Sequence, residues 1–320
     1  MLIIPFAFFL VMLEFAVGSH LALYALDVRN DSSFGFFRLQ ALINLVLFSL
    51  LAWGTQHGFT STQQLKLDGF HLDFAWLSHQ EFTLGWFLLF QLAYLITMLS
   101  PAWRAARLVA GGLASAFGIA CLLCVGMGLR PIASATLGGF FTVAGFMCGA
   151  LAIGGVSTAM LLGHWYLNTP TASGKPLEFA TLITIAGIVL QIAFGLLSGP
   201  VTYSAPKMAA VAPATTSQAQ HSHVLAAATP APVGTPAVTP TPAGKPVSGP
   251  VPSGVSFSTP ILLLLEYVLG LGVPLALSVL ALRLERERSF QSATGMLYIA
   301  VVFAFFGEIL ARGLFLRPLV

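Results

Sequence analysis

Long, unbroken runs of apolar residues constrain the fold of this chain more than any other feature of its sequence. A helix needs about 20 mostly apolar residues to cross the hydrocarbon core of a bilayer, whereas a transmembrane barrel shows short segments of alternating polarity. The sequence therefore predicts an all-α protein, a polytopic transmembrane bundle of about eight helices in contact with the lipid bilayer. The eight runs occupy residues 2–26, 39–53, 82–99, 108–129, 137–167, 179–199, 260–282 and 293–315.

The composition agrees with a membrane location and argues against other classes of protein. Hydrophobic residues make up 57% of the 320 residues and charged residues only 8%, whereas a soluble domain carries about 25% charged residues. Too few charges remain to cover a surface that faces water. The net charge of +3 is spread along the chain without a basic stripe, so the sequence predicts no nucleic-acid partner.

Two polar segments separate the apolar runs. Residues 54–81 mix charged and aromatic side chains and are expected to form a non-cytoplasmic cap loop. Residues 200–258 are rich in Ala, Pro and Thr, with ten prolines between positions 204 and 253. Such a segment cannot bury enough apolar surface to offset its ordering entropy, so we expect a disordered linker. The chain would then consist of a six-helix block at 1–199, this linker, and a two-helix block at 259–320.

The distribution of Lys and Arg predicts the orientation in the membrane. Basic residues in short loops accumulate on the cytoplasmic side, and with eight spans they fall eight on one side and three on the other, outside the long linker. The larger group is therefore expected to be cytoplasmic. This makes the chain a multi-pass cell-membrane protein with both termini on the non-cytoplasmic side. The larger group is Arg29, Arg38, Arg104, Arg107, Lys175, Arg283, Arg286 and Arg288; the smaller is Lys66, Arg130 and Arg317.

Ionisable residues inside the apolar runs are candidate functional residues. Each costs about 2.5–3.5 kcal/mol at the centre of a membrane helix on insertion scales, and such residues usually mark a site. Glu308 and Arg312 are four residues apart and share a helical face, with Glu in the favourable N-terminal position for an ion pair. This pair is either structural or a carboxylate that binds or deprotonates a ligand. Glu14 and Glu266 have no partner in their own runs and must be protonated, paired across helices, or open to a cavity.

Two histidines, His20 and His164, are predicted to lie at similar depth on different helices. That arrangement suits a bis-imidazole haem b, a hydrogen bond to a quinone oxygen, or plain packing. Amide side chains add to the polar residues of the runs: Gln40, Asn44, Gln91 and Gln191. Small residues crowd the run at 137–167, which predicts close helix packing there.

One segment carries a resemblance to a known family. Residues 307–315 read Gly-Glu-Ile-Leu-Ala-Arg-Gly-Leu-Phe. This resembles the last helix of the membrane-anchor subunits of dimethyl sulfoxide reductase-type enzymes, the DmsC/NrfD-like group, whose pattern is Gly-Glu, two aliphatic residues, a small residue, Arg, then Phe. The first helix, with Glu14-Phe15-Ala16-Val17-Gly18, is loosely similar to the first helix of that group. The match covers about a tenth of the chain.

The resemblance implies an integral membrane subunit of a respiratory-type oxidoreductase complex. Such a subunit exchanges electrons and protons between membrane quinone and a peripheral iron–sulfur or molybdenum redox subunit, and Glu308 and Arg312 would lie near the quinone site. The alternatives from the residues themselves are a transporter or proton-path bundle and a haem b-binding, cytochrome-like subunit. Pro274 interrupts the run at 260–282 without a counterpart elsewhere, which does not favour the matched broken helices of transporters.

Overall fold

The described part of the chain is a bundle of long helices, as the apolar runs predict. The computed structural model describes residues 3–30, 32–57, 73–132, 138–169, 173–198 and 259–316. Within these ranges the elements are helical and no strand occurs, so the all-α prediction is confirmed. The bounds are α1 Ile3–Arg29, α2 Phe34–His57, α3 Phe74–Thr97, α4 Arg104–Gly128, α5 Gly138–Asn168, α6 Lys175–Ser198, α7 Thr259–Leu265, η4 Glu266–Gly272, α8 Val273–Arg286 and α9 Phe290–Leu316, with short 3-10 turns η2 Pro101–Trp103 and η3 Arg130–Ile132.

Seven helical stretches of the described residues are long and apolar enough to cross a membrane, which identifies a multi-pass membrane protein. Helix α3, which contains most of the predicted span at 82–99, is not among the seven; it begins earlier, at Phe74, and carries the polar Gln80, Glu81 and Gln91. The predicted cap loop at 54–81 is helical at both ends, in α2 and α3. Its middle, and the predicted linker at 200–258, lie outside the described residues.

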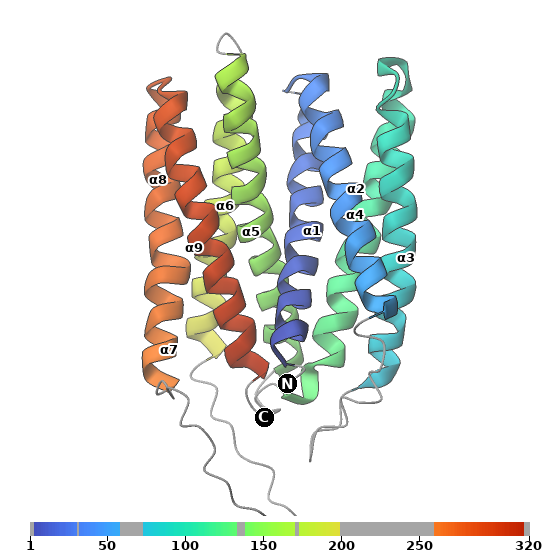
Figure 1. Ribbon diagram of the computed structural model, residues 1–320, viewed down its shortest axis with the longest axis vertical. Coiled ribbons are helices and arrows are strands. Elements are labelled where there is room, and N and C mark those ends of the chain that lie inside the picture. The colour runs from blue at the N-terminus through green and yellow to red at the C-terminus, as the bar shows by residue number, and fades with distance from the viewer. Residues whose placement is uncertain are drawn as a thin grey trace, which may run out of the picture. The chain divides into compact units, whose positions relative to one another are not determined.

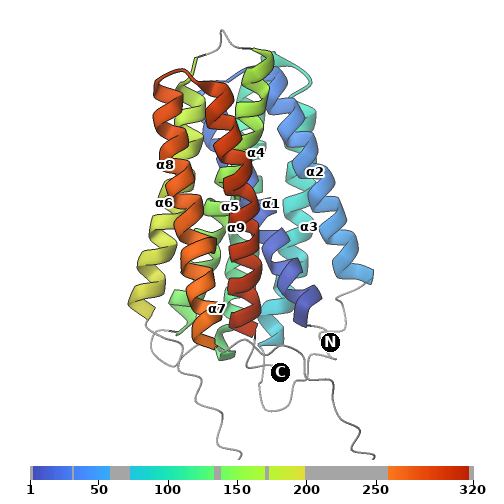
Figure 2. The same cartoon turned by 60° about the vertical axis from the view of Figure 1, so that its left-hand side comes forward.

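The helices run alternately up and down, so the two ends of the bundle differ (Figures 1 and 2). The connections α1–α2, α3–α4, α5–α6 and α8–α9 lie at one end, and the start of α1 and the end of α9 lie at the other (Figure 2). All eight basic residues of the larger group are in or next to these four connections, and we call this the arginine-rich end. Asn30 and Arg288 adopt left-handed φ values of 54° and 59° in two of the turns.

Helix α1 is the central element of the bundle. It packs against α2, α4, α5, α6 and α9, and residues on all its faces are buried, including Leu10, Leu13, Val17 and Leu23. A helix that is apolar all round has no preferred outward face and is suited to a central position. Polar groups on α1, such as Glu14, must therefore find partners on the surrounding helices.

Small residues bring α1, α5 and α6 into backbone contact, which confirms the close packing predicted for the run at 137–167. A Cβ atom on Gly18 of α1 would lie 1.7 Å from the carbonyl oxygen of Ala150, and one on Gly154 would lie 2.1 Å from the carbonyl carbon of Gly18. On the other side of α5, a Cβ on Gly187 of α6 would lie 2.5 Å from the nitrogen of Ala152. Without a hydrophobic driving force between helices in lipid, such approach maximises van der Waals contact.

The continuous helix formed by α7, η4 and α8 contains a π-helical segment close to a proline. The turns of η4, Glu266–Gly272, precede Pro274, which stands in the first turn of α8. Proline lacks an N–H and its ring clashes with the carbonyl four residues earlier, and a local π-helix is one way in which a helix adapts to such a disruption. At this level Gly270 meets Gly307 of α9: a Cβ on Gly307 would lie 2.3 Å from the Cα of Gly270.

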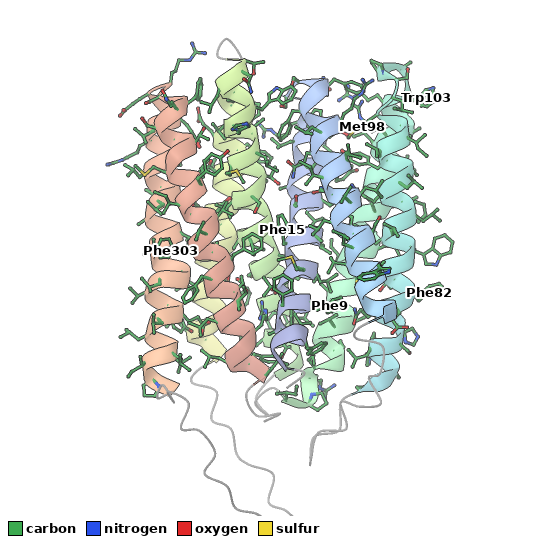
Figure 3. All side chains as sticks on the ribbon, in the orientation of Figure 1. Phe9, Phe15, Phe82, Met98, Trp103 and Phe303 are labelled. Carbon is green, nitrogen blue, oxygen red and sulfur yellow. The ribbon has the colours of Figure 1, made fainter. Side chains whose placement is uncertain are left out.

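The outer surface of the bundle is apolar. Exposed large side chains occur on the outward faces of α2, α3, α4, α6, α8 and α9, among them Leu50, Phe82, Leu196 and Val302. Figure 3 shows Phe82 and Trp103 projecting away from the helices at different heights. A surface with so much contiguous apolar area requires a nonpolar environment, which agrees with helices that cross a bilayer.

Candidate functional site

The main candidate site is an ion-pair cluster of Glu14, Glu308 and Arg312. Arg312 of α9 donates from Nε to Glu14 Oε2 of α1 at 3.1 Å, and its Nη2 contacts Glu14 Oε1. The same Nη2 lies 3.3 Å from Oε2 of Glu308, one turn earlier on α9. The pair expected from the spacing of Glu308 and Arg312 is thus present. Of the possibilities open for Glu14, the structure shows pairing across helices.

Helices α5 and α6 complete the surroundings of the cluster. The Gln191 side chain of α6 donates to Glu308 Oε1 at 2.6 Å. On α5, the backbone oxygen of Gly145 accepts a hydrogen bond from Arg312 Nη2 at 3.2 Å, and the guanidinium carbon lies 4.2 Å from the centre of the Phe146 ring. Four helices therefore contribute to the cluster, and all three charged side chains are buried.

Gly149 provides the space that the cluster occupies. A Cβ atom on this residue would lie 2.9 Å from Arg312 Nη2 and 3.0 Å from Glu14 Oε1 and Glu308 Oε1. These three atoms belong to the three charged groups of the cluster. Any side chain at position 149 would therefore press on all of them, so glycine is required here for close approach and not for an unusual backbone angle.

The cluster holds more acidic groups than basic ones. If all three side chains are ionised, two carboxylates against one guanidinium leave a net charge of −1 in a nonpolar region. Such a charge is costly, and a bound proton would remove it. The arrangement can therefore store a proton on a carboxylate that remains held by hydrogen bonds. Sequence reasoning identified each of these residues but not that one arginine serves both acids.

Glu266 lies at the start of the π-helical segment, on the side of the cluster formed by α9. It interacts electrostatically with Glu308 and Arg312, but the structure gives it no ion pair or hydrogen bond among the described residues. Its side chain is partly exposed. Glu266 is therefore a third carboxyl group near the cluster, outside the contacts that hold the other two.

His20 belongs to a different polar region, between α1, α2, α3 and α4. Its Nε2 lies 3.1 Å from the carbonyl oxygen of Gly111 and 3.3 Å from the Ser115 hydroxyl. The ring is enclosed by Tyr24, Phe87 and Tyr94. Next to it on α1, Ser19 donates to Asn44 Oδ1 and accepts from Gln40 Nε2, both at 2.8 Å. Gln40 and Asn44 thus bond to Ser19, the neighbour of His20 in sequence, and not to His20 itself.

His164 does not join this region. It is exposed near the arginine-rich end of α5, where its Nδ1 lies 3.0 Å from the Tyr298 hydroxyl of α9. The contacts of His20 come from α3 and α4 and those of His164 from α9. The described residues thus give the two histidines no common contact, and the arrangement required for a bis-imidazole haem is not supported by their partners.

The structure also reveals a buried ion pair that sequence reasoning missed. Asp27 Oδ2 accepts hydrogen bonds from Arg107 Nε at 3.0 Å and from the Tyr94 hydroxyl at 2.9 Å, and all three side chains are buried. Asp27 directly follows the apolar run at 2–26 and Arg107 directly precedes the run at 108–129, so neither is a polar residue inside a run. The available signal was one acid and one arginine at the same predicted level of neighbouring helices.

A second acid was missed for a similar reason. Glu285 lies in the Arg-Leu-Glu-Arg-Glu-Arg segment at 283–288, whose three arginines predict a cytoplasmic connection between helices. It is buried, and its Oε1 accepts a hydrogen bond from the Thr181 hydroxyl of α6 at 2.7 Å. Within the described ranges, no group of three or more His, Cys, Asp or Glu side chains is arranged to hold a metal ion.

Comparisons with protein-family models, with curated proteins and with solved structures found no match for this chain. The arguments for function therefore come from the geometry and chemistry of the cluster itself.

Proposed function

We propose that this protein is the integral membrane subunit of a respiratory-type redox complex and exchanges electrons and protons with membrane quinone at the Glu14–Arg312–Glu308 cluster. The observation that carries the proposal is the single buried guanidinium shared by two carboxylates. Conversion between a quinone and a quinol moves protons together with electrons. A site for this conversion therefore needs a group that gains and loses a proton in a nonpolar region.

The chemistry of the cluster supports this assignment. Arginine is a permanent hydrogen-bond donor that orients acceptors such as carboxylates, and carboxyl groups exchange protons readily when environment and neighbours tune them. Glu266 adds a further carboxyl group on the partly exposed side. The resemblance of residues 307–315 to the DmsC/NrfD-like anchors supports the same proposal, since Glu308 and Arg312 are the polar residues of that motif.

The proposal extends to location and partners. The eight basic residues of the arginine-rich end support a cytoplasmic location for that end, in a protein of the cell membrane. Both termini and the segment at 200–258 are then non-cytoplasmic. By the same resemblance, the electron partner is a peripheral iron–sulfur or molybdenum subunit. In this role the chain is the quinone-facing part of an oxidoreductase.

Binding of a quinol analogue tests the proposal. The variant replaces Glu14→Gln, Glu308→Gln and Arg312→Met together, which removes every charge of the cluster while keeping side-chain volumes similar. A triple replacement is needed because changing Arg312 alone leaves two buried acids unpaired, at a cost of about 3–5 kcal/mol for breaking a buried pair. The probe is a fluorescent hydroxyquinoline N-oxide, titrated against purified protein in nanodiscs.

We expect the triple variant to assemble and to bind the analogue at least about tenfold more weakly, because a hydrogen bond to a charged group contributes about 1.5–3 kcal/mol. Glu178→Gln, at a partly exposed residue of α6 away from the cluster, is the control and should bind as the wild type does. An assembled triple variant with wild-type affinity would contradict the proposed site.

A second candidate function, a proton-coupled transporter, is favoured by one observation. The π-helical segment η4 begins at Glu266 and ends just before Pro274, and π-helical turns often occur at functional sites. Reconstituted vesicles containing a pH-sensitive dye distinguish the two. A proton flux through the protein that is lost in Glu266→Gln, without binding of the quinol analogue, would favour transport.

A further inference from the structure

Glu285 is a buried acid in the last turn of α8, at the arginine-rich end. Its relative exposure is 1%. Its Oε1 accepts the hydrogen bond from Thr181, whereas Oε2 has no hydrogen-bond partner among the described residues. The residue plays no part in the Glu14–Arg312–Glu308 cluster, which lies farther from the arginine-rich end.

The surroundings of Glu285 differ from those of every other buried acid in the described part of the chain. Glu14 and Glu308 share Arg312, and Asp27 is paired with Arg107. Glu285 has no arginine, lysine or histidine within ion-pair distance in the described ranges. An ionised Glu285 would need a cation as much as the other buried acids do, because an isolated carboxylate in a nonpolar interior is destabilised by desolvation.

The charged groups that act on Glu285 do not supply that compensation. They are Glu178 of α6, which repels a negative charge on Glu285, and Arg286 of α8, which attracts it. Arg286 points outward with a side-chain exposure of 63% and lies 3.9 Å from Glu178, whose exposure is 32%. The arginine next in sequence is thus solvated and directed toward a different acid. One hydroxyl donor, Thr181, is the polar contact left for Glu285.

We propose that Glu285 is an uncharged carboxylic acid that binds a proton and exchanges it with water at the arginine-rich end. The buried position and the missing cation favour the neutral form. Exchange is expected because the residue lies one and two positions before the exposed Arg286 and Glu287, at the end of its helix. The assignment does not depend on the function proposed above, since it concerns a separate group that makes no contact with the cluster.

Infrared difference spectroscopy tests the proposal on the whole protein in lipid. The spectrum of wild type minus Glu285→Gln at neutral pH should contain a protonated carboxyl C=O band that the wild type has and the variant lacks. That band should shift when the sample is equilibrated in D₂O. Glutamine retains the volume and can still accept the bond from Thr181, so the variant is expected to fold. Glu178→Gln is the matched control and should remove carboxylate bands instead.

Carboxylate bands in the Glu285→Gln difference spectrum would overturn the proposal, and a C=O band that does not shift in D₂O would overturn the exchange. A second measurement uses the unmodified protein. A hydrophobic carbodiimide reacts with protonated carboxyl groups in nonpolar surroundings, and peptide mass mapping should find the adduct on Glu285 and not on the arginine-paired Asp27. Absence of an adduct at Glu285 would count against it.

Discussion

At the scale of single residues, the cluster shows how a charged group is accommodated inside a membrane helix bundle. Arg312 is surrounded by two carboxylates, one backbone oxygen and one aromatic ring. An apolar side chain in place of either carboxylate would leave a buried donor unsatisfied, which costs more than a missing bond at the surface. The backbone of α5 approaches closely only because position 149 has no side chain.

Gly149→Ala should therefore destabilise the protein. The added methyl group would lie 2.9–3.0 Å from atoms of all three charged side chains, and overpacking of this kind typically costs about 1–3 kcal/mol. The measurement is the thermal unfolding midpoint of detergent-solubilised protein. Gly145→Ala, on the same helix with open space around its Cβ, is the control and should unfold like the wild type. Equal midpoints for the two variants would contradict the packing described here.

At the scale of helices, η4 and α9 approach more closely than side chains allow, through Gly270 and Gly307. This contact precedes Glu308 directly, so it fixes the height of the cluster relative to the π-helical segment. Helix α6 has a related role: Thr181 and Gln191 donate to Glu285 and Glu308. These donors are ten residues apart, which is about 15 Å along a helix axis, so α6 supports buried acids at two levels.

Gly307→Ala should force α9 away from η4, because its Cβ would lie 2.3 Å from the Cα of Gly270, which is backbone and cannot rotate aside. We expect a lower unfolding midpoint and weaker binding of the quinol analogue, since Glu308 is the next residue. Gly313→Ala, on the same helix with nothing within 4 Å of the added atom, should change neither property. A Gly307→Ala protein that behaves like Gly313→Ala would show that the approach is not required.

At the scale of the whole molecule, the alternating direction of the helices places the start of α1 and the end of α9 at one end of the bundle and the basic connections at the other (Figure 2). At least one arginine at that end also donates hydrogen bonds to the backbone of a neighbouring helix. Arg38, for example, donates to the carbonyl oxygens of Met98 and Leu99 at 2.6 and 2.8 Å, which satisfies two carbonyl groups just after the end of α3. The charges that are expected to orient the protein thus also connect neighbouring helices.

Cysteine labelling tests the proposed orientation. A membrane-impermeant maleimide added from outside should modify a cysteine introduced at Thr235 and should not modify one at Ser289, in the α8–α9 connection. The positive-inside rule gives the reason for this expectation. The native Cys121, Cys124 and Cys148 are buried, and the protein without an added cysteine serves as the control. Modification at Ser289 alone would reverse the orientation.

Much of the fold could be predicted because the constraint acts along the chain. Backbone groups in hydrocarbon must be satisfied within one helix, so apolar length alone indicates a helix, and the runs match the observed elements to within a few residues at most ends. The exception at α3 has a physical reason. Its first two turns carry polar residues, including Gln80 and Glu81, which an apolar-run criterion excludes even though they continue the helix.

The sequence by itself determined which residues are costly in a membrane, and hence that Glu14, Glu308 and Arg312 need partners. Only the tertiary structure decided the partners. Glu14 and Arg312 are 298 positions apart, and their contact depends on glycines that let α1, α5 and α9 approach. Glu285 and Asp27 show the converse. They lie at the ends of helices, where sequence position does not distinguish a solvated charge from a buried one, so the sequence does not show that burying them is costly. Burial is a property of the packed bundle, because it depends on neighbours from other helices.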